Sequence, residues 1–381
     1  MTSTTTTTTT RTDAAAPTTK APAAPQPAAP ATPPAAGPER PRRLRARTLD
    51  DKLSFAGAAA GSLALTWVLY GKILPFSGLI GFVIVWYVVF LVMYATVTSL
   101  SSPRPVVVDR VAGAMVQAGA AIVAIALLST VFYTYIRGLP VALHLNFITK
   151  DMSGVRPTAP LNEGGILHAI VGSFIEVGIA VVISLPLGLA TAVYMVEVGG
   201  RLSKIVRTVV EAMTAVPDIL AGLFVYTTLI VALGFPKSGL AAGLAIAVTM
   251  VPIIARASDV VLRVVPGGLR EAGLALGASQ WQVVRHVVLP TARPGLATAL
   301  ILGIARGIGE TAPVLIVSGA STFLNFDPTE NTMNSLPLFI FTGVRSGQPT
   351  YIDRGFGAAA VLLTLVLLLF AVTRWLARPK V

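Results

Sequence analysis

The chain has 381 residues, of which 54% are hydrophobic and only 12% are charged, and its formal net charge is +12. Soluble domains carry about 25% charged residues, so this composition indicates an integral membrane protein and excludes an ordinary soluble domain. In such a protein an excess of Lys and Arg is typical of cytoplasmic loops, so we expect no nucleic-acid partner. The absence of cysteine excludes disulfides and thiolate nucleophiles. The three histidines are scattered without metal-ligand spacing, so we expect no metal site and no cofactor.

The first segment is rich in Thr, Ala and Pro and includes an unbroken run from Thr4 to Thr10. Such a composition cannot bury a core and predicts disorder, and it is too polar for a signal peptide. A basic cluster follows and is typical of a juxtamembrane anchor. We therefore expect residues 1–50 to form a disordered cytoplasmic tail with a basic anchor. The cluster comprises Arg40, Arg42, Arg43, Arg45, Arg47 and Lys52.

The remainder of the chain contains repeated apolar stretches of the length that a helix needs to cross a bilayer, about 20 residues. Alternating segments of the kind that build membrane barrels are absent. The sequence therefore predicts an all-α polytopic membrane protein with about eight transmembrane helices. The expected spans are 54–72, 77–99, 111–136, 165–195, 209–233, 239–263, 294–319 and 356–377.

The distribution of basic residues predicts the orientation of these spans. Most of the 29 Lys and Arg residues fall in the segments that share a side with the N-terminus. Because such residues collect on the cytoplasmic side, we expect both termini and the loop 264–292 to be cytoplasmic. Two longer loops, at about 137–164 and 320–355, are then external.

The loop 264–292 has the signals of two short helices. Pro266 suits a first helical turn, and Gly277 suits the left-handed position that ends a helix. Ser279 and Gln282 have the spacing of a capping box for a second helix, which we expect Pro290 to end. Three large apolar side chains gather near the glycine turn, and they fit either a helix pressed on lipid headgroups or a docking site for a partner. They are Leu274, Leu276 and Trp281.

The same loop resembles the EAA signature of the permeases of ABC importers. The matching residues are Glu271-Ala272-Gly273, Gly277, Val287 and Leu289-Pro290. The resemblance implies a coupling helix that is held by a cytoplasmic ATPase. The chain has no G-x-x-x-x-G-K-[ST] phosphate loop, so we expect the ATPase to be a separate chain and this chain not to be an enzyme. The residues to which the resemblance assigns coupling are Glu271, Ala272, Gly277, Trp281, Leu289 and Pro290.

Two charged residues, Arg306 and Glu310, stand inside the expected span 294–319. A charge at the centre of a bilayer costs a few kcal/mol or more, and residues at i and i+4 can pair on one helix face. The pair is either a structural lock or a site at which the guanidinium meets a crossing anion. We expect Pro313 to break this helix one turn beyond Glu310, with Thr311 as a polar lining residue or a backbone partner.

Glycines in the same span predict close helix packing. Gly303 and Gly307 form a G-x-x-x-G face, which allows a neighbouring helix to approach closely.

The run from Ala305 to Pro313 resembles the A-R-x-x-G-E-T-A-P signature of PstA-type phosphate permeases. The segment around Arg256 and Asp259 is similar to that family's P-I-I-x-R-x-x-[DE] stretch, and the segment around Pro217 to its V-P-S-I stretch. Asp218 stands where this family usually has Ser, which leaves the polar role of that position open.

The resemblance covers about 111–377 and implies a type I permease core of six helices that carries inorganic phosphate. It makes Arg256, Arg306 and Glu310 the principal functional charges, although Arg256 also suits an interfacial anchor. We expect two extra N-terminal helices in 51–105 and the permease domain in 106–381.

The implied partners are a second homologous permease, a cytoplasmic ATPase dimer and an extracytoplasmic phosphate-binding protein, all at the cell membrane. Alternatives are a permease for sulfate or molybdate, and a secondary transporter, which the lack of a repeated half disfavours. Two further alternatives are a membrane-embedded enzyme and a scaffold that does not transport.

Overall fold

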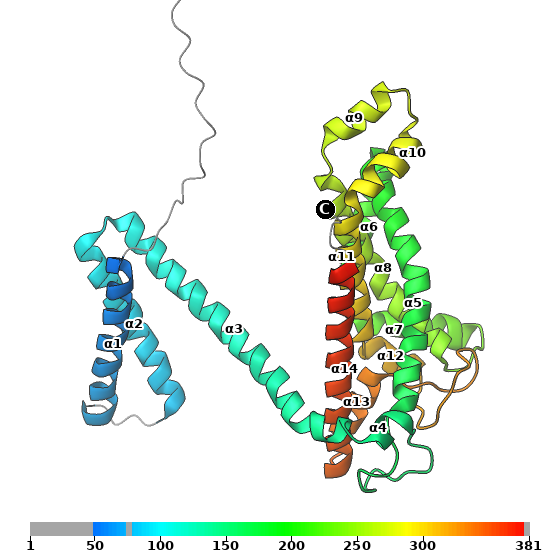
Figure 1. Ribbon diagram of the computed structural model, residues 1–381, viewed down its shortest axis with the longest axis horizontal. Helices are drawn as coiled ribbons and strands as arrows, with labels where there is room; N and C mark the ends of the chain where they lie inside the picture. The colour runs from blue at the N-terminus through cyan, green and yellow to red at the C-terminus, as the bar shows by residue number, and fades with distance from the viewer. Residues whose placement is uncertain (1–48, 74–77, 377–381) are drawn as a thin grey trace, which may run out of the picture. The chain divides into compact units, whose positions relative to one another are not determined.

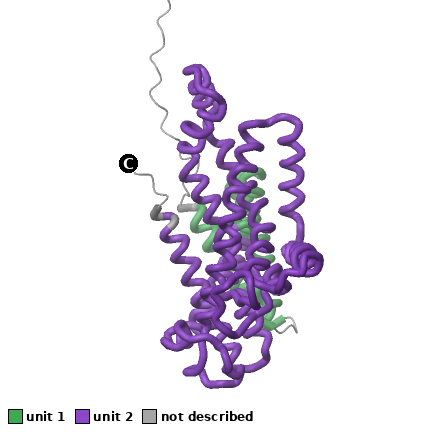
Figure 2. Tube along the Cα trace, turned by 90° about the vertical axis from the view of Figure 1, so that its right-hand side faces the viewer, with its two compact units in different colours: residues 1–116 green, residues 117–381 purple. Residues whose placement is uncertain are grey.

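The computed structural model describes residues 49–73 and 78–376 (Figure 1). The expected tail 1–50 therefore lies almost wholly outside the described residues. The chain divides into two compact units, the first ending at Val116 and the second beginning at Gln117 (Figure 2). Within the described residues the structure is helical, and the only β feature is an isolated bridge between Gly319 and Met333.

The first unit contains α1 (Leu49–Val68), α2 (Leu79–Ser101) and the beginning of α3 (Arg104–Ala142). A small core joins the three helices through Ala58, Phe90, Tyr94 and Ala114. The ring of Phe55 meets the edge of Phe90 with 5.3 Å between the ring centroids, a geometry that aromatic pairs favour. Most other large apolar side chains of this unit are exposed, as helices that face lipid require.

The second unit contains the remaining helices. They are α4 (Leu145–Thr149), α5 (Leu167–Val193), α6 (Gly200–Thr214), α7 (Asp218–Val225), α8 (Gly239–Val264), α9 (Gly267–Ala275), α10 (Gln280–Val283), α11 (Leu289–Ile308), α12 (Ala312–Val317), α13 (Leu336–Arg345) and α14 (Pro349–Leu376). Turns of π-helix continue α1 at Leu69–Ile73, α5 at Tyr194–Val198 and α7 at Tyr226–Ala232, and one at Val284–Val288 joins α10 to α11.

Helix α8 is the centre of the second unit and packs against α5, α6, α7, α11 and α12. Small residues on α8, such as the fully buried Ala241 and Ala245, allow its neighbours to approach closely. Gly303 and Gly307 of α11 lie directly against Ile254 and Met250 of α8, so that a β-carbon at either glycine would collide. The predicted G-x-x-x-G face therefore forms a helix contact.

Residues 49–73 and 78–376 contain seven helices that are long and apolar enough to cross a membrane, or up to eight if a bent pair counts as one span. The prediction of a polytopic helical bundle with about eight spans is confirmed. The expected single helix at 209–233 is wrong, because α6 and α7 meet at a bend of 101°. Pro217 causes this break, since it lacks an N–H and disfavours helical geometry at Val216 before it.

The expected helix at 294–319 is also interrupted, but not where we placed the break. Helix α11 ends at Ile308, before Glu310, and α12 begins at Ala312. Pro313 stands in the first turn of α12, where its missing N–H costs nothing. Its ring would clash with the carbonyl of Gly309 in a continuous helix, so the proline breaks the helix on its N-terminal side.

The second helix of the loop 264–292 does not end at Pro290, contrary to the prediction. A single helical segment runs from Gln280 to Ile308. The π turn at Val284–Val288 adds a residue to the helix, with Leu289 N–H bonded to the Val284 carbonyl. Such turns accommodate local distortion of a helix. This one precedes Pro290, which has no backbone N–H to donate to the helix.

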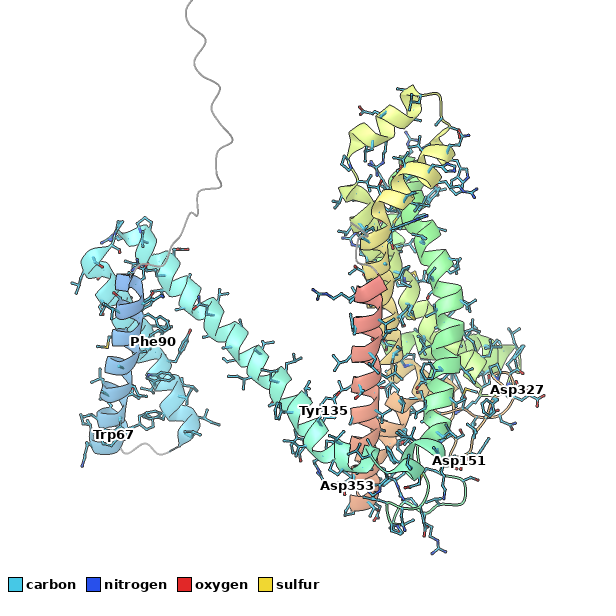
Figure 3. The ribbon with its side chains drawn as sticks, in the orientation of Figure 1. Trp67, Phe90, Tyr135, Asp151, Asp327 and Asp353 are labelled. Carbon is cyan, nitrogen blue, oxygen red and sulfur yellow. The ribbon has the colours of Figure 1, made fainter. Side chains whose placement is uncertain are left out.

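The loop after α4 and the loop after α12 lie on the side of the bundle away from α9 and α10 and are joined to each other (Figure 1). They are called the joined loops below. The Met152 N–H donates to the Thr322 carbonyl at 3.0 Å, and the Leu324 N–H donates to the Asp151 carboxylate at 3.0 Å. Asp151 and Asp327 mark these loops in Figure 3. Hydrogen bonds from Thr329 hold the pKa of the Asp327 carboxyl below its usual range. The two loops thus form one ordered surface.

Candidate functional site

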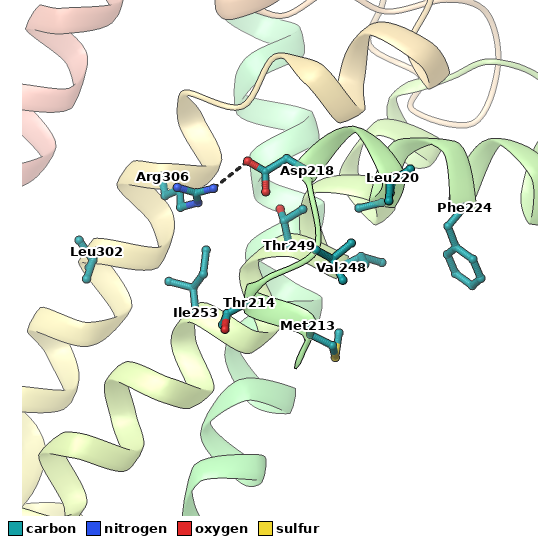
Figure 4. Close-up of a pocket in the computed structure, with 12 residues that line it drawn as sticks. Met213, Thr214, Asp218, Leu220, Phe224, Val248, Thr249, Ile253, Leu302 and Arg306 are labelled. Atoms are coloured by element: carbon teal, nitrogen blue, oxygen red, sulfur yellow. Dashed lines mark hydrogen bonds and ion pairs between the residues drawn. The ribbon is translucent and has the colours of Figure 1, made fainter. Parts of the chain in front are cut away.

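A cavity of about 700 Å³ opens among α6, α7, α8 and α11 (Figure 4). Most of its wall is apolar, and its polar groups come from four residues on different helices. They are Thr214, Asp218, Thr249 and Arg306. A mostly apolar cavity with a few convergent polar groups is typical of a small-molecule site.

Among the residues that the structure describes, Arg306 is the only basic one that lines this cavity, and it lies in the last turn of α11. Its Nη2 is 2.7 Å from Oδ2 of Asp218, and its Nε is 3.3 Å from Oε1 of Glu310. Figure 4 shows the guanidinium pointing toward Asp218. The expected contact between Arg306 and Glu310 therefore forms, although Glu310 stands beyond the end of the helix. One guanidinium is held between two carboxylates.

The two helix breaks create this arrangement. Asp218 is the first residue of α7 and follows Pro217, so the bend at Pro217 brings its carboxylate to the cavity. Glu310 lies in the gap between α11 and α12, where its side chain is 8% exposed, whereas that of Arg306 is 49% exposed. Arg306 is thus fixed by a buried carboxylate on one side and keeps an open face toward the cavity.

The other two residues predicted for the substrate pathway lie outside this cavity. Arg256 pairs with Glu211, with 2.7 Å between Nη1 and Oε1, and both side chains are half exposed. Thr311 precedes α12 and lines a separate cavity of about 390 Å³ beside α13. Asp259, which matches the family's acidic position, is buried and bonded to Arg207 at 2.8 Å and to Arg263 at 3.2 Å.

Sequence reasoning missed two carboxylates. Asp218 was noted only for its departure from the family pattern, yet it contacts Arg306. Glu176 of α5 is fully buried and contacts Ser318, with 2.6 Å between Oε1 and Oγ. A lone acidic residue inside an apolar span is a functional signal in itself, and this signal was available for both residues.

The loop 264–292 folds as a helix, a glycine turn and a second helix. Gly277 has φ of +83°, and it completes a Schellman motif in which the Gly277 and Ala278 N–H groups bond the carbonyls of Leu274 and Gly273. Ser279 and Gln282 form both hydrogen bonds of a capping box. The predicted turn chemistry is therefore confirmed.

This turn exposes large apolar side chains at the end of the second unit. Leu276 is 89% exposed and Trp281 is 64% exposed, while Val283 and Val284 on the opposite face are buried. Of the predicted coupling residues, Glu271, Ala272 and Gly277 are also exposed, and Leu289 and Pro290 are half-buried at the base of α11. Exposed aromatic and aliphatic residues around a rigid turn form a surface suited to a protein partner.

Comparison with known proteins shows the family. Residues 184–378 match the family described as "Binding-protein-dependent transport system inner membrane component". The chain is 42% identical to the phosphate transport system permease protein PstA 1 of Mycobacterium tuberculosis strain H37Rv over 219 residues, which are 57% of this chain and 70% of that protein. The chain belongs to the family of inner membrane components of binding-protein-dependent transport systems. It is also 35% identical to the PstA permease of Haemophilus influenzae over 240 residues, 62% of this chain and 82% of the relative.

The resemblance of the sequence to PstA-type permeases of ABC importers is therefore confirmed. A structure titled "Inward facing conformations of the MetNI methionine ABC transporter: CY5 native crystal form" has 24% identity and a TM-score of 0.45, over 56% of this chain and 93% of that one. The family match and the long apolar helices of the described residues together indicate a multi-pass membrane protein. The region that matches the family contains the cavity, Arg306, Glu310 and the loop 264–292.

The loop of the permease is fastened to the rest of the helical bundle by Arg270 of α9. Arg270 pairs with Glu197, with 2.9 Å between Nη2 and Oε1, and Glu197 lies in the π turn that ends α5. The same guanidinium donates to the carbonyls of Val265 and Leu262 at 2.6 and 2.9 Å. Arg270 therefore connects the loop to the ends of both α5 and α8.

Proposed function

We propose that this chain is a transmembrane subunit of an ATP-driven importer of inorganic phosphate. The observation that carries the proposal is the cavity in which Arg306 is presented between two carboxylates. Its planar guanidinium matches the geometry of a tetrahedral oxyanion and keeps its charge at any physiological pH. The relatives that are named phosphate permeases support phosphate as the anion.

Within this proposal Arg306 contributes electrostatic attraction in a cavity whose wall is mostly apolar. Removing an oxyanion from water is costly unless charge and hydrogen bonds replace the lost hydration. Arg306 has five N–H donors, and its contacts with Asp218 and Glu310 leave others to bind the anion. Glu310 positions the guanidinium. Arg256 and Thr311 lie outside the cavity; Thr311 is proposed to act at another stage of the pathway, and Arg256 as an interfacial anchor.

The exposed turn of the loop 264–292 is proposed to dock into a cytoplasmic ATPase dimer. This assignment places both chain termini in the cytoplasm and the joined loops near Asp151 and Asp327 on the outside. A second homologous permease completes the pathway, and an extracytoplasmic phosphate-binding protein delivers the anion to the outer surface. Residues 106–381 form the permease domain, with two extra helices in 51–105.

The proposal is tested by reconstituting the complete importer in proteoliposomes and measuring ATP-dependent uptake of radiolabelled phosphate. Arg306→Gln removes the charge but keeps a polar side chain, and we expect uptake to fall roughly 100-fold, since a hydrogen bond to a charged group contributes about 1.5 to 3 kcal/mol. Arg104→Gln, which changes an exposed arginine at the start of α3 that is not part of the cavity, the turn or the joined loops, is the matched control and should transport normally.

Uptake by the Arg306→Gln importer at the wild-type rate, with normal assembly, would remove Arg306 from the mechanism. Uptake without ATP would instead indicate a secondary transporter. Competition by excess sulfate or molybdate separates the importers of those anions from a phosphate importer.

A further inference from the structure

Asp218 lines the cavity beside the guanidinium that is proposed to bind the anion, and an acidic residue at that place needs an explanation. Two carboxylates, Asp218 and Glu310, contact the one guanidinium of Arg306. When all three groups are ionised their charges sum to a net negative charge. A fully deprotonated oxyanion that enters this site therefore meets repulsion as well as attraction.

The other polar groups of the cavity also lack free hydrogens. Thr214 donates its hydroxyl hydrogen to the Glu211 carbonyl at 2.7 Å, and Thr249 donates to the Ile246 carbonyl at 2.8 Å. A threonine hydroxyl has one hydrogen and two lone pairs, so in this arrangement both threonines offer only acceptors. Among the described side chains, the cavity thus presents one donor, Arg306, and three acceptors, of which Asp218 is the strongest.

We propose that Asp218 selects oxyanions that carry a proton, because its carboxylate lines the same cavity as Arg306 and can only accept hydrogen bonds. The inference rests on the proposed function and concerns specificity at the same site. A protonated oxyanion donates its O–H to Asp218 while its other oxygens accept from Arg306. Phosphate and arsenate keep at least one proton at neutral pH, and sulfate keeps none.

The physical basis is the cost of an unmatched polar group. A site built to hydrogen-bond one substrate rejects an analogue that lacks the bonding group, since the polar groups of the site are then left unpaired. Sulfate has nearly the same shape as phosphate but places an acceptor against the Asp218 carboxylate. The discrimination arises at the permease itself and does not depend on the protein that delivers the anion.

The test uses the purified importer complex, with the full chain and without the extracytoplasmic binding protein. Equilibrium binding of radiolabelled phosphate and radiolabelled sulfate gives the preference of the cavity. We expect wild type to prefer phosphate, and Asp218→Asn to reduce that preference roughly tenfold, because a charge-assisted hydrogen bond is lost and the new amide can donate to sulfate. Asp218→Glu keeps an acceptor carboxylate and should retain the preference.

Several outcomes would overturn the inference. One is an assembled Asp218→Asn complex with an unchanged preference. Another, which needs no variant, is a wild-type complex that binds sulfate as tightly as phosphate, or from which arsenate fails to displace phosphate. The proposed function fails separately, when the wild-type importer shows no ATP-dependent phosphate uptake at all. An importer that transports phosphate but distinguishes phosphate from sulfate equally well without the carboxylate of Asp218 would contradict only the present inference.

Discussion

Arg256 and Arg306 have the same side chain but different surroundings. Arg306 faces the cavity and contacts two carboxylates, whereas Arg256 contacts Glu211 at a half-exposed position outside it. An ion pair of the second kind contributes roughly 0 to 1 kcal/mol. A position on the cavity wall with one buried carboxylate partner, rather than the presence of a charge in an apolar segment, distinguishes a candidate transport residue from a surface ion pair.

We therefore expect Arg256→Gln to change ATP-dependent phosphate uptake by less than about fivefold, which corresponds to about 1 kcal/mol. Arg306→Gln in the same assay is the comparison. The double variant with Glu211→Gln should show no further loss if the two residues act only on each other. A loss with Arg256→Gln as large as that with Arg306→Gln would place Arg256 in the pathway after all.

Glu176 shows how much a single buried residue depends on its neighbours. The Ser318 hydroxyl lies 2.6 Å from both the Glu176 carboxyl and the Met333 carbonyl. The hydroxyl therefore links the carboxyl of α5 to the backbone of Met333. This contact joins the middle of α5 to the segment after α12, and no local sequence pattern in either segment predicts it.

At the scale of the helices, the coupling turn depends on the backbone of Gly277. Its φ of +83° is strained for any residue with a side chain, although there is free space around it. Gly277→Val should cost about 1 to 2 kcal/mol and weaken copurification with the ATPase roughly five- to thirtyfold. Gly268→Ala, at an open helical position of α9, is the matched control and should assemble normally. An intact Gly277→Val complex would count against the docking surface.

The elements show which features could be read from the sequence. The length of the apolar stretches predicted the spans. The residue types at Gly277, Ser279 and Gln282 predicted the turn between α9 and α10, because these signals are local. The breaks at Pro217 and Pro313 were misjudged, since a proline marks a break without giving its direction or angle. The contact of Asp218 with Arg306 depends on the 101° bend between α6 and α7, which only tertiary packing fixes.

At the scale of the whole molecule, the cavity and the coupling turn belong to one framework. Arg270 ties the turn to the end of α5 and to α8, and α8 packs against α11, which carries Arg306 at its far end. Rigid helices and close glycine contacts transmit displacement better than loops do. A push on the turn therefore has a continuous packed route to the guanidinium, as a permease driven by a separate motor requires.

That mechanism needs the coupling turn and the joined loops to face opposite sides of the membrane. The chain has no cysteine, so single-cysteine variants report their own position without background. Leu276→Cys lies at the exposed turn and Glu330→Cys at an exposed position in the joined loops. In intact cells, a membrane-impermeant maleimide should label Glu330→Cys and not Leu276→Cys, because basic segments stay in the cytoplasm. Permeabilised cells, in which both sites react, provide the control. The reverse pattern in intact cells would contradict the proposed orientation, since the exposed turn would then face the outside, where no cytoplasmic ATPase could bind it.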